Sequence, residues 1–396
     1  MSTVSEIEEP DQRSGIISTG LALFSMFFGA GNLVFPLLVG QEAGSHTPWA
    51  LMGLSLSAVG FPLLGLVAMM FYGGNLRLFL ARLGKMPAFI LLFILQVSMG
   101  PLGCMPRLIT LMHASLKPYF PELTLLVFSI LAAAIIFALT VRPQKVVDLL
   151  GVILTPLLLL TLAILIVVGL IDAPAIQPSV AGASHHFMEG VKGGYQTMDL
   201  LGSLLFATVV MPHLARGLSR LSPDQSKKLL RNRIIGASAI ATVLLMATYM
   251  GLCWISAHHG WTLPAGLLPE EKLHAIAVKI LGPFGGAIAS TAVILACLTT
   301  AISLATVFSD YLRVDVFQKK TGSVLPLALT LGGTAAVANL GFTGIVRFMG
   351  PLLEILYPGI IVLCLLNIAH HYYQVKPLRV PVFIALAVAA ISFCIS

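Results

Sequence analysis

The chain has 396 residues, of which 58% are hydrophobic and 10% are charged, and its mean hydropathy is +0.97. A soluble protein of this composition would be unable to cover its surface with polar side chains, so we expect the chain to lie in a lipid bilayer. The net charge of +7 does not indicate nucleic-acid binding, because the basic residues lie in short loops with no stripe interleaved with aromatic residues.

The chain divides into about eleven apolar segments, which predicts an all-α polytopic membrane protein. Short polar loops separate these segments, as in one bundle of packed helices rather than a series of soluble domains. The predicted spans are 16–39, 47–72, 87–114, 122–139, 147–170, 191–212, 234–257, 282–312, 324–340, 343–368 and 380–395.

Residues 1–15 form a polar head that is acidic where a cleavable signal would be basic, and we interpret them as a cytoplasmic tail. With this tail inside, about 17 of the 23 lysine and arginine residues fall on the cytoplasmic side, as the positive-inside rule requires. The N-terminus is therefore expected in the cytoplasm.

The first span is interrupted near its centre by Gly29-Ala30-Gly31-Asn32, residues poorly suited to a continuous apolar helix. The sixth span carries Gly202-Ser203-Leu204-Leu205-Phe206 where the first carries Gly31-Asn32-Leu33-Val34-Phe35. Since five spans precede the sixth, the two halves would have opposite orientations, and interrupted helices at corresponding places are typical of secondary transporters. The predicted units are a first five-helix repeat at 16–170, an inverted repeat at 191–368 and an additional helix at 380–395.

A helix broken at mid-membrane exposes backbone N–H groups at one new end and carbonyl groups at the other. An amino-acid zwitterion can partner both, with its carboxylate near Gly31 and its ammonium at the carbonyls around Phe27 and Phe28. Asn32 adds an amide oxygen that can face a cation. The alternative for Gly29 and Gly31 is close helix packing alone.

The sixth span places Asp199 at membrane depth, where a carboxyl group is costly and should face a cavity, a cation or a hydrogen-bond donor. Two interpretations stay open: a group of the substrate site or helix break, and a structural residue that bonds neighbouring backbone. The predicted substrate-binding residues are Phe28, Gly29, Ala30, Gly31, Asn32, Thr197, Met198, Asp199, Gly202 and Ser203.

In the eighth span, Ala296, Thr299 and Thr300 share one helical face at the three- and four-residue spacing. Two hydroxyls and a carbonyl can converge there, and sodium requires several such oxygen ligands, whereas thiolates select other metals. The alternative is that the threonines bond the carbonyls of their own helix.

Arg107 lies near the middle of the third span, where an unpaired charge would be expensive. Glu354 in the tenth span is the expected partner, and the pair would be either a gating element or a static structural contact. Arg347 is an alternative partner for Glu354, two turns away on the same helix.

The run from Phe28 to Pro36 followed by Gly40, together with Gly100-Pro101, Pro106-Arg107 and Gly194-Tyr195, is similar to the branched-chain amino acid carriers, the BrnQ or LIVCS family. This resemblance implies a LeuT-like 5+5 inverted-repeat fold with the first and sixth helices broken. It also implies a location in the bacterial cytoplasmic (inner) membrane, uptake of leucine, isoleucine and valine, and coupling to sodium or protons.

The resemblance also implies roles for individual residues. The Phe28 carbonyl would form a sodium site with Ala296, Thr299 and Thr300, and the amides near Gly31 would take the substrate carboxylate. Asn32 would serve a second ion site.

The predicted function is secondary active import of apolar amino acids, including methionine, by alternating access. No phosphate loop, serine elbow or metal-ligand spacing is present, so no cofactor is expected besides the coupling cation. Two alternatives remain: an intramembrane enzyme with Asp199 and Glu354 as paired acids, and an amino-acid sensor that binds without transport. The oligomeric state stays open.

Overall fold

The computed structural model describes residues 12–141, 154–171, 173–215, 218, 222–374 and 379–395. Within these ranges the secondary structure is helical throughout, with no strand. Six helical segments of the described chain are long and apolar enough to cross a membrane, and five shorter apolar helices accompany them. The predicted class, an all-α membrane protein, is confirmed.

The helices fall into two halves. The first half contains α1 (Gln12–Phe27), α2 (Ala30–Ala43), α3 (Thr47–Ser55), α4 (Phe61–Met70), α5 (Leu76–Ala81), α6 (Lys85–Met99), α7 (Cys104–Leu116), α8 (Leu125–Thr140) and α10 (Thr155–Ile171). The second half contains α11 (Ala183–Thr197), α12 (Asp199–Leu214), α13 (Pro223–His259), α14 (Lys272–Leu281), α15 (Pro283–Tyr311), α16 (Val324–Ala338), α17 (Gly341–Tyr373) and α18 (Arg379–Ile395).

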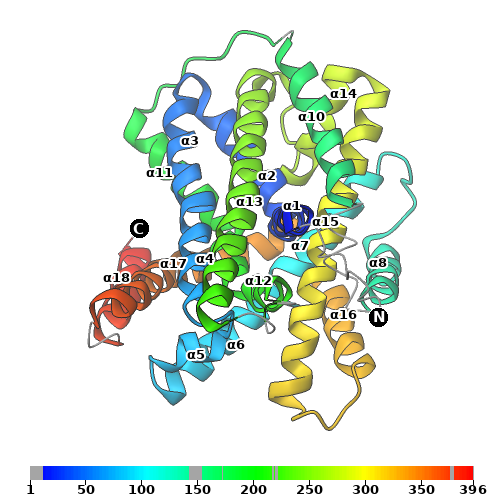
Figure 1. Cartoon of the computed structure of the whole chain (residues 1–396). Helices are drawn as coiled ribbons and strands as arrows, with labels where there is room; N and C mark the ends of the chain where they lie inside the picture. The colour runs from blue at the N-terminus through cyan, green and yellow to red at the C-terminus, as the bar shows by residue number, and fades with distance from the viewer. Residues whose placement is uncertain are drawn as a thin grey trace, which may run out of the picture.

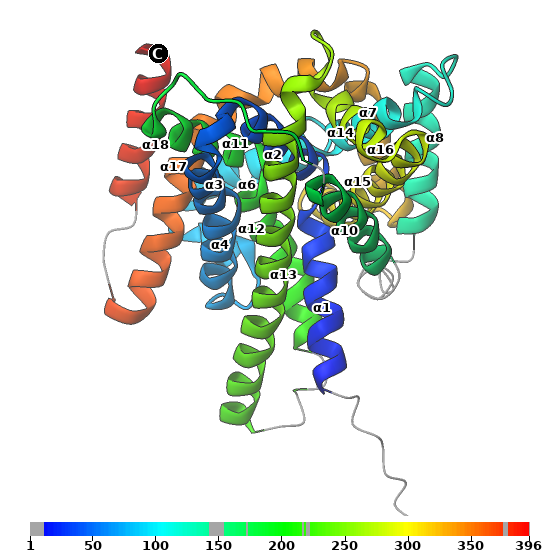
Figure 2. The same cartoon turned by 90° about the horizontal axis from the view of Figure 1, so that it is seen from above.

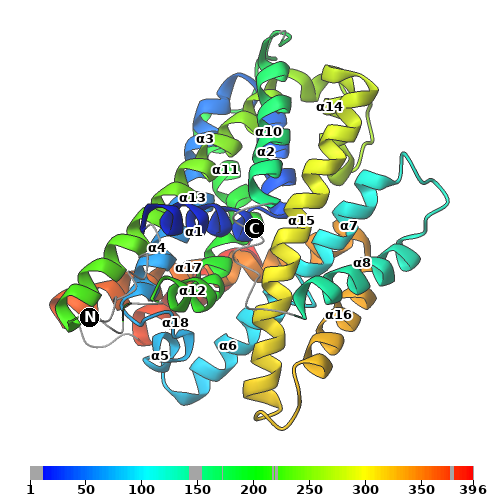
Figure 3. The same ribbon diagram turned by 45° about the vertical axis from the view of Figure 1, so that its right-hand side comes forward.

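Helices α1, α2 and α12 lie near the centre of the bundle, and α11 packs beside α3 (Figures 1 and 2). Helices α17 and α18 form one flank and α8 and α16 the opposite flank, as Figure 2 shows. Helix α13 packs along both α1 and α2, and the long tilted helix α15 contacts α7, α10 and α16 (Figure 3). Segments from both halves of the chain therefore surround the same central region.

Small residues allow helices from the two halves to touch at their backbones. A Cβ added at Gly53 on α3 would lie 2.0 Å from the carbonyl oxygen of Phe187, and one added at Gly190 on α11 would lie 2.0 Å from that of Ala50. Close approach through small residues is the usual way in which membrane helices associate, because lipid leaves little hydrophobic driving force between them. This contact fixes α11 against α3.

The outer surface carries many exposed apolar side chains, as expected of helices that face lipid. Examples on four different helices are Phe89 (62% exposed), Val243 (66%), Phe348 (62%) and Ile391 (60%). The polar side chains described below are instead buried at the centre. This distribution is the reverse of a soluble fold and agrees with the composition.

The helix boundaries differ from the predicted spans at several places, among them the seventh span, predicted at 234–257, which is α13 and begins at Pro223. The third span is divided into α6 and α7 by Gly100–Gly103, an interruption that the sequence did not predict, and α14 is an additional short helix. The sixth span begins at Ala183 rather than at 191, because its first turns are polar and lower the local hydropathy. The predicted tail, 1–15, lies largely outside the described residues, as does the start of the fifth span at 147–153.

Candidate functional site

The first break separates α1 from α2. Helix α1 ends at Phe27, Gly29 is extended, and α2 begins at Ala30. The side chain of Asn32 reaches back so that its Oδ1 accepts a hydrogen bond of 2.9 Å from the backbone N–H of Gly29. Asn32 therefore satisfies one of the backbone donors that the start of a helix leaves without a partner.

The second break separates α11 from α12 at Met198. This residue has φ 66° and ψ 16°, the left-handed backbone conformation that residues other than glycine rarely adopt. Its N–H donates to the Tyr195 carbonyl (3.1 Å), and its carbonyl accepts from the N–H of Gly202 (2.9 Å). The chain therefore ends one helix and starts the next within a single residue, and the surrounding structure must hold this conformation.

The two breaks are joined by side chains. The amide nitrogen of Asn32 donates to both carboxyl oxygens of Asp199, at 2.9 and 2.7 Å. The hydroxyl of Tyr249 on α13 donates to the same carboxyl group at 2.6 Å and also contacts the Asn32 amide. All three side chains are at most 2% exposed.

These contacts show what surrounds Asp199. It faces hydrogen-bond donors on α2 and α13 instead of bonding neighbouring backbone. The Asn32 oxygen, which the sequence suggested for a cation, accepts from the Gly29 N–H in this structure. Tyr249 was missed, although a tyrosine in the middle of an otherwise apolar span was a signal that could have found it.

Gly31 lies where the backbones of the two breaks cross. A Cβ added there would be 2.9 Å from Cα of Thr197 and 3.0 Å from the carbonyl oxygen of Gln196. Glycine is required at this crossing because any side chain would push α2 away from α11. The structure thus shows a packing role for Gly31 beside the first break.

The predicted oxygen face of α15 lies against α1. The Thr299 hydroxyl is 2.9 Å from the carbonyl oxygen of Ala296 and 3.1 Å from that of Ser25, and the Thr300 hydroxyl is also 3.1 Å from the Ser25 oxygen. The contacting carbonyl is thus that of Ser25, one helical turn before the predicted Phe28. Two hydroxyls and two carbonyls converge in a region from which solvent is excluded.

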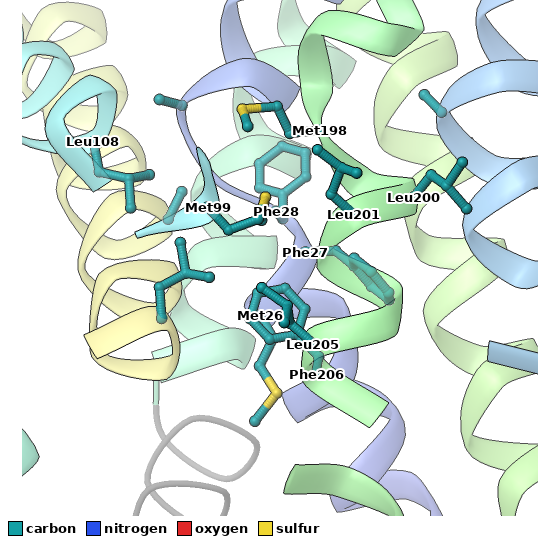
Figure 4. Packing of buried hydrophobic residues seen from close by; sticks show 14 of the residues in the cluster. Met26, Phe27, Phe28, Met99, Leu108, Met198, Leu200, Leu201, Leu205 and Phe206 are labelled. Atoms are coloured by element: carbon teal, nitrogen blue, oxygen red, sulfur yellow. The ribbon is translucent and has the colours of Figure 1, made fainter. Parts of the chain in front are cut away.

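Apolar side chains line the other side of the breaks (Figure 4). The rings of Phe27 and Phe206 meet edge to face with centroids 5.5 Å apart, and those of Phe24 and Phe28 stack at 5.1 Å. Met198 and Phe28 belong to the same cluster of buried apolar residues. The buried polar groups therefore stand beside an apolar surface.

Gly202 and Ser203, which the sequence placed in the substrate site, lie against other helices in this structure. A Cβ added at Gly65 on α4 would lie 2.1 Å from the Ser203 hydroxyl, which itself donates to the Leu200 carbonyl at 2.7 Å. The nearest atom of another helix to a Cβ added at Gly202 belongs to Met99 on α6, at 3.4 Å. Both residues serve helix packing in this structure.

The predicted contact between Arg107 and Glu354 is not formed. The ion pairs of the described chain are Arg77–Asp315, Lys192–Glu189 and Arg313–Asp310. Arg107 instead donates from Nη1 to the Gln196 carbonyl at 3.1 Å. Glu354 lies in a partly exposed position on α17.

A cavity of about 620 Å³ opens at one end of the bundle. Its wall includes Gln96 on α6, Thr208 on α12 and Thr306 on α15, and its mouth includes Arg77 and Arg313. The half-helix α12 thus runs from the second break to this cavity.

Comparison with known proteins identifies the family. Residues 12–395 match the family model described as branched-chain amino acid transport protein. The chain belongs to this family of transporters. Its helices, buried centre and apolar exterior are those of a multi-pass membrane transporter, and the predicted family is confirmed.

Curated relatives agree with this assignment. The transporter is 33% identical to the branched-chain amino acid permease BrnQ of Bacillus subtilis, over 92% of this chain and 83% of the relative. It is 29% identical to BrnQ of Escherichia coli, over 94% and 84% respectively. These relatives are named as permeases, so the transporter is not an enzyme and the predicted alternative of paired catalytic acids is wrong.

Solved structures show the same fold. A Na+-coupled sialic acid symporter superimposes with a TM-score of 0.58 and 11% identity, over 96% of this chain and 90% of that one. The manganese transporter of Eremococcus coleocola gives a TM-score of 0.54 and 14% identity, over 100% and 90%. The predicted LeuT-like fold is confirmed, and at these identities the likeness concerns the fold alone.

Proposed function

We propose that the transporter imports leucine, isoleucine and valine, and also methionine, by alternating access coupled to a cation. The observation that carries this proposal is the meeting of two interrupted helices through Asn32 and Asp199 in a buried region beside an apolar surface. Interrupted helices near the membrane midplane are the usual place for substrates in inverted-repeat transporters.

The proposed substrate site comprises the segments at the two breaks. The carboxylate of the amino acid lies at the amides that begin α2 near Gly31, and its ammonium lies at carbonyls that end the preceding half-helix. The side chain contacts the apolar surface that includes Phe27, Phe28 and Met198. The proposed contacts are Phe28, Gly29, Ala30, Gly31, Asn32, Thr197, Met198 and Asp199.

The proposed cation is sodium, with a proton as the alternative. Its ligands are the hydroxyls of Thr299 and Thr300 and the carbonyls of Ala296 and Ser25, with the Phe28 carbonyl as a further ligand. Neutral oxygens at a helix break suit Na+, and they would exchange their present contacts with one another for contacts with the ion. Such an ion would link α1 to α15 and so couple its own binding to the position of the first broken helix.

The proposed orientation places the N-terminus in the cytoplasm of a bacterial cell and the protein in the cytoplasmic membrane. Arg77 and Arg313 then lie at the cytoplasmic mouth of the 620 Å³ cavity, as the positive-inside rule favours. The cavity provides the inward route for substrate when the central site opens toward that side.

A counterflow experiment tests the transport proposal against the sensor alternative. Purified protein is reconstituted in vesicles loaded with unlabelled leucine, and external labelled leucine is added without any ion gradient. A transporter exchanges the two pools, so labelled leucine enters faster than in vesicles loaded with glutamate. Saturable binding with no transient accumulation would instead support a sensor.

A further inference from the structure

Arg107 on α7 is a buried cation with few partners. It is 1% exposed, and its Nη1 donates to the Gln196 carbonyl at 3.1 Å. Its Nε and Nη2 have no hydrogen-bond partner among the described residues, and none of the ion pairs there includes it. A guanidinium held in a membrane interior without a counter-charge is costly, so the unused donors indicate a missing acceptor.

The guanidinium lies where the broken helices meet. The Gln196 carbonyl that it contacts is also 3.0 Å from the position of a Cβ added at Gly31. The next residue on α7, Leu108, reaches the first break, because its Cδ2 lies 3.0 Å from a Cβ added at Gly29. Arg107 is therefore next to both breaks and not at the periphery of the bundle.

In the described chain, two other buried polar atoms without a hydrogen-bond partner lie close to Arg107. They are the hydroxyl of Tyr357 on α17 and Oε1 of Gln196. The ring of Tyr357 lies 4.4 Å from that of Tyr195, the neighbour of Gln196, whose carbonyl Arg107 contacts. The guanidinium and hydroxyl supply donors for an anion, and the amide oxygen supplies an acceptor for a cationic group.

We propose that Arg107 and Tyr357 bind the α-carboxylate of the amino-acid substrate, while Gln196 Oε1 faces its ammonium group. This inference rests on the proposed function and names the charged partner of the substrate. Nε and Nη2 form one edge of a guanidinium, and a carboxylate accepts from such an edge through two parallel charge-assisted bonds. The same carboxylate would thus accept hydrogen bonds from Arg107 on α7 and from the backbone amides that begin α2.

This arrangement makes the free carboxylate a requirement for tight binding. Leucinamide keeps the side chain and the ammonium of leucine but has no negative charge, so it would leave the buried guanidinium without a counter-charge. Losing one partner of a buried charge pair typically weakens binding by about 30-fold or more. Equilibrium binding to the purified wild-type transporter should therefore favour leucine over leucinamide by at least that ratio.

The decisive variant is Arg107→Gln. Its affinity for leucine should fall about 30-fold or more, its affinity for leucinamide should change little, and the ratio between the two should approach one. Arg107→Lys keeps the charge but loses the bidentate edge, so its ratio of leucine to leucinamide affinity should lie between those of Arg107→Gln and the wild type. Arg347→Gln is the matched control, because Arg347 is an exposed arginine on α17. This variant should bind both compounds as the wild type does.

Tyr357→Phe keeps the proposal testable if Arg107→Gln fails to fold. This variant retains the ring that packs on Tyr195 and removes only the hydroxyl, so it should fold, which thermal unfolding checks. Its leucine affinity should fall about three- to tenfold, with a smaller change for leucinamide.

The outcomes separate this inference from the function on which it rests. A wild type that binds leucine and leucinamide equally, or an Arg107→Gln variant that keeps the wild-type ratio, would overturn the role of Arg107 and leave the transport proposal intact. A wild type that binds no branched-chain amino acid would overturn both.

Discussion

The amide nitrogen of Asn32 lies 2.7 and 2.9 Å from the two carboxyl oxygens of Asp199, a contact between residues 167 positions apart in the chain. It ties the start of α2 to the start of α12, so these two helices cannot separate without breaking it. Tyr249 completes the cluster from α13. This cluster therefore holds the two helix breaks and α13 together.

Tyr249→Phe tests how strongly the cluster holds the structure. The substitution keeps the ring, whose centroid lies 6.4 Å from that of Phe28, and removes the hydroxyl that donates to Asp199. We expect the free energy of unfolding to fall by about 1 to 3 kcal/mol, because a buried carboxyl group loses a donor. Thermal unfolding in detergent measures this, with Tyr373→Phe, at an 81% exposed tyrosine, as the control. Equal stability of both variants would show that the cluster contributes little.

The sequence predicted the first break better than the second for a physical reason. Gly29 and Gly31 mark the first break directly, because glycine disfavours helix and permits close approach. At the second break the left-handed residue is Met198, which has no intrinsic preference for that conformation. The break there is held by tertiary contacts of the next residue, Asp199, and local propensity does not contain that information.

The candidate ion site shows the same limit. The hydroxyls of Thr299 and Thr300 were predictable because the residue type alone identifies a side-chain hydroxyl. The opposing ligand is a backbone carbonyl, which every residue type has, so nothing distinguished Ser25 from Phe28. Arg107 was recognised as unusual, but its partner depends on which faces of α7 and α17 meet, and helix packing decides that.

Thr299→Ala and Thr300→Ala test the proposed sodium site. Each removes one neutral oxygen from the cluster beside Ser25, which should cost about 1 to 3 kcal/mol of ion binding. The sodium concentration that gives half-maximal leucine uptake should therefore rise roughly tenfold or more. Thr291→Ala is the control, because this threonine is exposed on the same helix. Unchanged sodium dependence in both site variants would reject the site.

The proposed topology predicts different labelling of two loops. In a chain whose five cysteines have been replaced, Ser222→Cys lies in the basic loop that is expected inside, and Val180→Cys lies in the loop expected outside. An impermeant thiol reagent added to intact cells should modify the cysteine at position 180, which is fully exposed in the structure, and spare the one at position 222. The reverse pattern would invert the topology.

Competition between amino acids tests the apolar surface beside the breaks. An apolar pocket distinguishes one methylene by only about 1 to 3 kcal/mol, so isoleucine, valine and methionine should each inhibit uptake of labelled leucine. Lysine and glutamate should inhibit weakly, because their side chains would bring an unpaired charge to Phe27, Phe28 and Met198. Strong inhibition by a charged amino acid with weak inhibition by the branched ones would contradict this substrate class.

The central claim, cation-driven import of branched-chain amino acids, is tested most directly by concentrative uptake in sealed vesicles. Labelled leucine is added to reconstituted vesicles under an inward sodium gradient, an inward proton gradient or neither. We predict that leucine accumulates above its external concentration under the sodium gradient and returns to equilibrium when an ionophore dissipates that gradient. Accumulation under the proton gradient alone would replace sodium by a proton, and equilibration without accumulation under both gradients would contradict coupled transport.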